Sequence, residues 1–265
     1  MQTLDGSFSF TEALRAAARW RSAGLLLAAG ALGALAGGLF LLSHPPLYEA
    51  QTTLTVEIDL SHTGELTIIE EDHVLGVVDA LISSTQVHEQ VAAAALAEGI
   101  DTDLYDLEER LQSERFFSEW TLRVRHEDAQ TAVHLADLWA ANALDTLQAG
   151  GGFARQVDAL YRRDDSYENC FKGSPAQPVH AYCGAQAWEA IESANHAQID
   201  VIQRSKQASK GLLAGMSFRL AGPAQTQDRP VLYDPLVSMA ASALGGMLMA
   251  VALLFFWQVR RGAGG

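Results

Sequence analysis

The chain has 265 residues, with 18 lysines and arginines against 32 aspartates and glutamates, so its formal net charge is −14. This charge argues against a nucleic-acid-binding protein, because neutralising phosphates requires a basic stripe and the sequence shows none. Apolar residues make up 49% of the chain, too many for a disordered protein and many for one soluble domain.

The first predicted element is a transmembrane helix over 22–43. The run Ala23–Leu42 holds 20 residues without a charge, and about 1.5 Å per helical residue makes it roughly as long as the hydrocarbon core is thick. A cleaved signal peptide is the alternative. The apolar run is longer than the roughly 7–15 residues of a signal peptide, and no clear small-x-small cleavage site follows it.

The next elements are predicted from residue periodicity. Strict alternation over Tyr48–Ile58 predicts a half-buried strand. An apolar stripe predicts helix over 70–98, with a second helix that begins at a capping box of Ser83 and Gln86 and ends at Gly99. Thr102 or Asp103 caps a third, shorter helix that extends to Leu111.

A second strand and the longest helices follow. Alternation over 120–125 predicts the strand, and Asp128 caps a long helix that we expect Gly150, Gly151 and Gly152 to end. Helix is expected again over 153–163 and over 186–213, and a third strand over Met216–Leu220.

Cys170 and Cys183 lie between the last two helices, within an expected loop over 164–184. An even pair in an oxidising compartment predicts a disulfide, and closing so short a loop stabilises a fold by about 3 kcal/mol in the chain-entropy model. A redox or metal pair is the alternative, but neither a CxxC spacing nor a nearby histidine pair supports it.

The last predicted element is a second transmembrane helix over 236–259. An approach spaced by prolines, which we expect to be extended and stiff, leads into the uncharged run Pro235–Val259. Near the end of the run stands an aromatic triplet that suits a membrane interface: Phe255, Phe256 and Trp257.

Charge fixes the expected orientation of the two helices. Residues 1–21 carry three arginines against two acidic residues, and the tail 260–265 carries two arginines and no acidic residue. The segment 44–235 holds 13 basic and 30 acidic residues. The positive-inside rule therefore places 1–21 and 260–265 in the cytoplasm and 44–235 outside the inner membrane. The predicted fold class is α+β, with a small sheet near the membrane and projecting helices.

Small residues recur at four-residue spacing in both runs. The pairs are Gly33 with Gly37 in the first run, and Ala241 with Gly245 and Ser242 with Gly246 in the second. Such spacing allows helix backbones to approach closely. Alanine and glycine are also simply common in membrane helices, and the sequence does not decide between the two explanations.

No catalytic, cofactor or metal site is predicted. None of the eight histidines is spaced as HxH, HxxxH or HExxH, and no GxSxG, SxxK or Cys-His nucleophile signature occurs. The acidic run Glu70–Asp72 heads a helix, where negative charge suits the dipole. We therefore expect a protein that is not an enzyme.

Four features together resemble the chain-length determinant, or polysaccharide co-polymerase, family of bacterial surface-polysaccharide pathways. They are the Pro-x-Tyr-x-Ala entry at Pro46, Tyr48 and Ala50; the helix after Ser83 and Ser84 with Val87 and Val91; the strand–Asp–helix unit Leu122–Asp128 followed by Ala132, Ala136, Trp139 and Asn142; and the exit over 221–235 with Pro223, Pro230 and Pro235. The resemblance covers 44–149 and 214–259.

The resemblance implies a membrane-anchored homo-oligomer that sets the length of O-antigen, capsule or exopolysaccharide chains, acting with a polymerase or an exporter, and it leaves open whether the protein touches the glycan. This chain differs from the family in a short region between Gly150 and Leu213, which carries the cysteine loop where relatives have a long uninterrupted helical hairpin. Its tail also has no kinase P-loop. An extracytoplasmic sensor or adaptor that signals to a separate cytoplasmic kinase is the alternative function.

Overall fold

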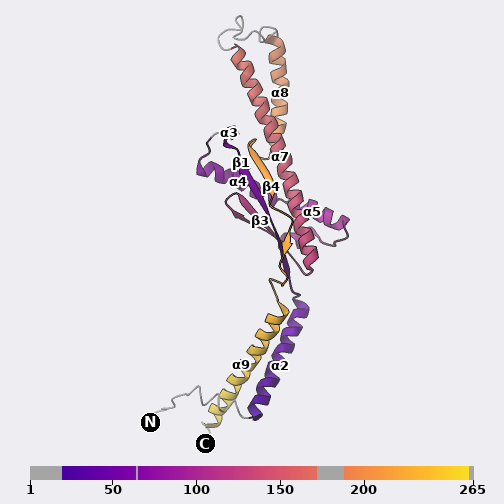
Figure 1. The fold of residues 1–265 in the computed structure, drawn as a ribbon, viewed down its shortest axis with the longest axis vertical. Coiled ribbons are helices and arrows are strands. Elements are labelled where there is room, and N and C mark those ends of the chain that lie inside the picture. The colour runs from indigo at the N-terminus through magenta and orange to yellow at the C-terminus, as the bar shows by residue number, and fades with distance from the viewer. Residues whose placement is uncertain (1–19, 64, 172–187, 263–265) are drawn as a thin grey trace, which may run out of the picture. The chain divides into compact units, whose positions relative to one another are not determined.

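The computed structural model describes residues 20–63, 65–171 and 188–262 and divides the chain into two compact units (Figure 1). One unit contains the chain up to Tyr48 and from Gln227 onward, and the other contains Glu49–Thr226. The α+β class predicted from the sequence is confirmed: two terminal apolar helices flank, in sequence, a set of helices and an antiparallel sheet.

The first unit is a pair of apolar helices, α2 (Trp20–Ser43) and α9 (Pro235–Gly262). The stretches Ala23–Ser43 and Pro235–Trp257 are long and apolar enough to cross a membrane, with mean hydropathies of 2.3 and 2.1. Helix α9 begins with proline at its first position, where the missing N–H costs nothing. The Asp234 carboxylate caps this end and accepts the N–H of Leu236 at 2.9 Å.

The second unit is built on an antiparallel sheet in the order β2-β3-β1-β4, with β5 also paired to β1. The strands are β1 (Tyr48–Ile58), β2 (Leu111–Phe116), β3 (Glu119–His126), β4 (Met216–Leu220) and β5 (Gln225–Thr226). The three predicted strands are confirmed as β1, β3 and β4. Strands β2 and β5 were not predicted, and Leu111 begins β2 instead of continuing a helix.

Short helices α3 (Leu60–Thr63), α4 (Ile68–Ile82), α5 (Thr85–Ala97) and α6 (Leu104–Arg110) join β1 to β2. Two of their caps were predicted: Asp103 accepts the Asp106 N–H at 2.8 Å, and Gly99, with φ +84°, follows the end of α5. The predicted capping box at Ser83 is wrong, because the Ser84 side chain caps α5.

One face of the sheet is buried against α4, α6 and α7, and α5 packs on α7. Every second residue of β1 and β3 is buried there, with Trp120, Leu122 and Val124 fully so. The buried indoles also satisfy their N–H groups: Trp120 Nε1 donates to Asp79 Oδ1 at 3.0 Å, and Trp139 Nε1 donates to the Ile82 carbonyl at 3.1 Å. Both bonds fasten α4 to the core.

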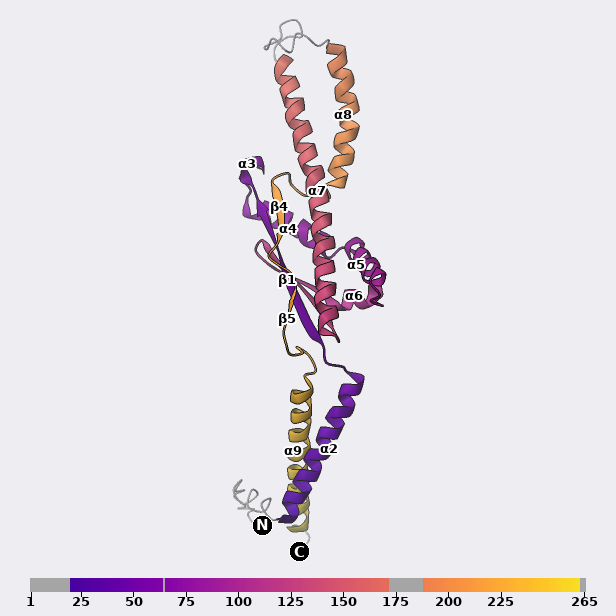
Figure 2. The same cartoon turned by 45° about the vertical axis from the view of Figure 1, so that its right-hand side comes forward.

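The longest element is α7 (Ala129–Phe171), a continuous helix of 43 residues that lies beside α8 (Trp188–Ala208) in Figure 2. The prediction that Gly150–Gly152 end this helix is wrong. Gly150 is buried, and a Cβ there would lie 2.9 Å from Leu212 Cδ1 and 3.3 Å from the Ser209 carbonyl oxygen. The lack of a side chain therefore allows a close contact, and packing outweighs the low helix propensity of glycine.

Helix α7 also shortens the loop expected over 164–184, since its backbone runs to Phe171. The helices expected before and after the cysteine region are confirmed as α7, which runs up to Phe171, and α8, which runs from Trp188. The Cys170 side chain and all of Cys183 lie outside the described residues, and their disulfide stays a prediction.

Candidate functional site

The contact between α2 and α9 is made by glycines whose added side chain would collide with the other helix. A Cβ on Gly33 would run into the Ser242 carbonyl oxygen, and one on Gly246 would run into the Ala29 carbonyl oxygen. On Gly37 it would lie 2.8 Å from Ser242 Oγ. The two helices are therefore in backbone contact, which small residues alone permit.

The other glycines of these helices divide into two groups. Gly30, which the sequence analysis did not select, faces Met247, whose methyl carbon would lie 2.6 Å from an added Cβ. Gly245, which it did select, has nothing within 4 Å of that position. Helical periodicity decides the difference, since Gly245 is one residue, about 100°, away from the contacting Gly246.

Where the chain leaves and re-enters this unit, two extended segments run together. Leu47 and Leu232 form an antiparallel bridge, with the Leu47 N–H 3.0 Å from the Leu232 carbonyl. Beside it, the rings of Phe40 and His44 stack at 4.2 Å, and the Tyr233 ring meets Phe40 edge-on at 5.8 Å. The ring cluster and the bridge hold the ends of α2 and α9 together.

The residues on which the sequence resemblance rests lie near the Leu47–Leu232 bridge, in β1, and between β4 and α9. Pro46 directly precedes Leu47 of the bridge, and Pro230 lies two residues before Leu232. Tyr48 begins β1, and Ala50 is fully buried opposite Thr226. Pro223 lies between β4 and β5, after Gly222, whose carbonyl accepts the Thr52 hydroxyl at 3.0 Å. Pro235 is the first residue of α9.

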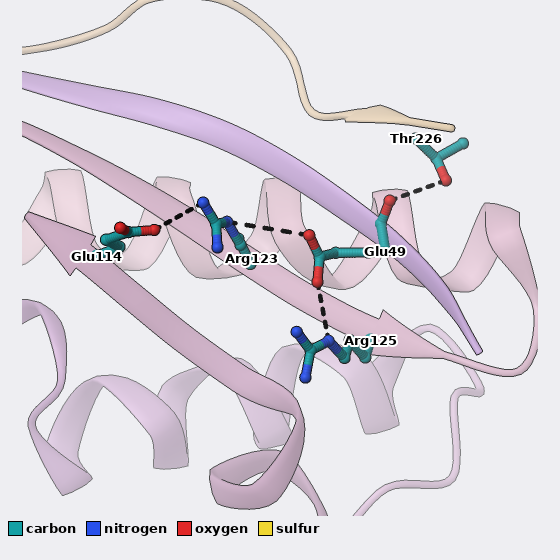
Figure 3. A network of polar contacts seen from close by, with 5 residues as sticks. All are labelled: Glu49, Glu114, Arg123, Arg125 and Thr226. Carbon is teal, nitrogen blue, oxygen red and sulfur yellow. Dashed lines mark hydrogen bonds and ion pairs between the residues drawn. The ribbon is translucent and has the colours of Figure 1, made fainter. Parts of the chain in front are cut away.

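A polar network crosses the other face of the sheet (Figure 3). The Glu49 carboxylate of β1 accepts a hydrogen bond from Arg125 Nε at 2.8 Å and lies 3.9 Å from Arg123 Nε. Arg123 also pairs with Glu114 of β2 at 2.6 Å, and the Thr226 hydroxyl donates to the Glu49 backbone carbonyl at 3.1 Å. Glu49 thus links β1 to β3 and β5, and Arg123 extends the network to β2.

The electrostatics of this network centre on Glu49, whose side chain is 15% exposed. Two guanidinium groups share its carboxylate, and Arg123 Nε is buried with a charge partner but no hydrogen bond. The carboxylate is therefore engaged on the sheet by two neighbouring guanidinium groups of β3. The network therefore suits a structural role.

Two histidines, the buried His88 and the partly buried His126, have pKa values below the ordinary 6.5. Burial lowers the pKa of His88, and the negative charge of Glu108 opposes that shift in part. Burial, followed by the charge of Arg110, lowers the pKa of His126, whose Nδ1 accepts the Asp128 N–H at 3.0 Å. Among the described residues, no group of three or more His, Cys, Asp or Glu side chains could hold a metal ion.

The acidic residues at helix starts act as caps. Glu70 forms a capping box with Thr67, and these hydrogen bonds lower the Glu70 pKa. The Asp128 carboxylate accepts the Thr131 N–H at 2.7 Å, which likewise lowers the Asp128 pKa and confirms the predicted cap of α7. Asp72 pairs with Arg115 and so links α4 to β2.

Comparison with known proteins finds similarity to solved structures and to nothing else that was compared. No family model matches the sequence, and no curated protein does. Among solved structures, the chain is similar to a full-length bacterial polysaccharide co-polymerase, with a TM-score of 0.40 and 11% identity over 96% of this chain and 98% of that one.

Proposed function

We propose that this chain is a membrane-anchored, non-catalytic scaffold that assembles with copies of itself and regulates the length or export of a surface polysaccharide. The observation that carries the proposal is the helix pair α2 and α9, packed through glycines and separated in sequence by one acidic α+β unit. Its outward surface is apolar: Leu27, Leu32, Leu248 and Phe256 are each 67–70% exposed. A surface of this kind is stable when lipid covers it.

The proposed arrangement keeps the predicted boundaries, with spans over 22–43 and 236–259 and the domain 44–235 outside the cell membrane. Acidic residues outnumber basic ones in that domain by 30 to 13. Both spans connect directly to the sheet, because β1 follows α2 and pairs with β4 and β5, which precede α9.

The polysaccharide class and the partners rest on the sequence motifs. Pro46, Tyr48 and Ala50 enter β1 in the family pattern, and Asp128 caps the helix of the strand–Asp–helix unit. A homo-oligomer that works with a polymerase or an exporter follows from this resemblance. Length control by such a scaffold requires no bond-making group, which agrees with the ion-paired state of the carboxylates on the sheet.

The test is a comparison of surface glycans from a strain that lacks the gene and from the same strain carrying the wild-type gene. The proposal expects the modal glycan length, or the exported amount, to change on deletion and to return on complementation. An unchanged length distribution and yield would refute it. A change in transcription alone, without a change in glycan, would support a sensor or adaptor instead.

A further inference from the structure

We infer that the groove between α2 and α9 binds one anionic phospholipid, with an acyl chain along its apolar walls and the phosphate at Arg260. The inference rests on the proposed membrane placement of these helices. It names a ligand class and a site that the scaffold function does not require.

The groove exists because the tight contact between the helices ends partway along them. The helices are antiparallel, since Gly30, Gly33 and Gly37 meet Met247, Ser242 and Ser238 in descending order. Toward the start of α2 the close contact is absent, since a Cβ added at Gly24 would meet nothing within 4 Å. The cavity there has a volume of about 540 Å³, within the usual range for small-ligand sites.

The walls of the groove are apolar and partly small. Ala28 and Ala29 of α2 and Ala250 of α9 line the space, together with Leu25 and Leu253. Three alanines leave room that larger residues would fill, and their methyl groups offer no hydrogen bond. An acyl chain matches walls of this chemistry, whereas a polar ligand would lose its hydration without compensation.

One charged residue, Arg260, lines the groove. Neither helix sequence contains an acidic residue, so neither helix offers this guanidinium a carboxylate. Trp257 stands one turn earlier on α9 and also lines the groove, a position suited to the membrane interface. A bidentate guanidinium favours phosphate, and basic pockets between spans on the cytoplasmic side are the pattern that binds anionic headgroups.

The experiment is quenching of Trp257 fluorescence by brominated lipid in vesicles that contain the full chain. Trp20→Phe removes the other tryptophan of the helix pair, and the same protein with Trp257→Phe gives the background. Dibromo-phosphatidylglycerol and dibromo-phosphatidylcholine are compared in unbrominated phosphatidylcholine. We expect a preference of about fivefold for the anionic lipid, from one arginine near an anionic headgroup.

Variants locate the preference. Arg260→Gln should reduce it to about one, and Ala250→Phe, which fills the groove, should reduce it too. The matched controls are Arg261→Gln, which removes the same charge one residue along, and Ala31→Phe, which adds the same bulk to an exposed position of α2. Both controls should keep the preference.

Each other outcome overturns a specific claim. Equal quenching by the two lipids in the wild-type chain would reject the site, as would an equal loss in Arg261→Gln, which would show diffuse surface charge instead. No quenching by either lipid would reject the membrane placement, and with it the proposed function. Because each result is a ratio within one variant, partial loss of folded protein does not mimic loss of the site.

Discussion

The glycine triplet in α7 gives the sharpest prediction, since three neighbouring residues with equal helix propensity differ in what surrounds them. Gly152 has open space where a Cβ would stand, so Gly152→Ala should stabilise the protein by about 0.5–1 kcal/mol, the usual gain of alanine over glycine in a helix. Gly150→Ala gains the same propensity but meets Leu212 at 2.9 Å and the Ser209 carbonyl at 3.3 Å.

The cost of that contact sets the size of the difference. Forcing a methyl group into packed surroundings costs about 1–3 kcal/mol, so Gly150→Ala should be less stable than Gly152→Ala by about that amount. Gly151→Ala, whose Cβ would lie 3.2 Å from Phe218 Cε2, should fall between them.

Urea unfolding of the full chain in detergent micelles measures this series through the fluorescence of the buried Trp120 and Trp139. A shift in the midpoint with an unchanged slope reports stability alone. Equal stability of the Gly150 and Gly152 variants would refute the packing of α7 against the segment before β4. Destabilisation by Gly152→Ala would refute the continuous helix.

Three further predictions concern the helix pair, the sheet network and pH. Gly33→Leu should separate α2 from α9 and lower the cross-linking yield between cysteines placed on the two helices, whereas Gly245→Leu, which faces open space, should leave that yield unchanged; equal effects would contradict the observed contact. Glu49→Gln should destabilise the protein to urea by about 1–3 kcal/mol, because two partly exposed arginines lose the carboxylate that they share. A variant as stable as wild type would show that the network contributes nothing. Folding lowers the pKa of His88 from 6.5, so as the pH falls the unfolded chain takes up this proton at a higher pH than the folded chain does. The free energy of unfolding should therefore fall as the pH drops below about 6.5, by at most about 1.4 kcal/mol per pH unit. His88→Leu should flatten that slope, and an unchanged slope would assign it to other groups.

The elements that the sequence predicted are those in which local pattern and burial agree. In β1 the alternating residues Ala50, Leu54 and Val56 are all buried, and the apolar runs of α2 and α9 are helices throughout. Asp128 and Asp103 cap helices because a short carboxylate satisfies free N–H groups wherever a helix begins.

Strand β2 could not be predicted from its own residues. It carries polar side chains on both faces, and its pairing depends on β3 and on the ion pair from Arg115 to Asp72. The continuity of α7 through Gly150–Gly152 likewise depends on residues about 60 positions away in the sequence, because Leu212 and Ser209 supply the contact.

The ion pairs of the sheet network could be predicted only by someone who knew the order of the strands. Alternation alone places Glu49 on the polar face of β1 and Arg123 and Arg125 on that of β3, so the complementary charges were visible in the sequence. That the two strands are neighbours is a non-local fact, and without it the ion pairs could not be assigned.

The most direct test of the central claim is the mass of the protein component in detergent, measured by light scattering with the detergent contribution subtracted. A scaffold that works by assembly should have a mass several times the 28.5 kDa of one chain, retained on dilution. A protein mass of one chain under conditions that preserve the folded domain would contradict the account.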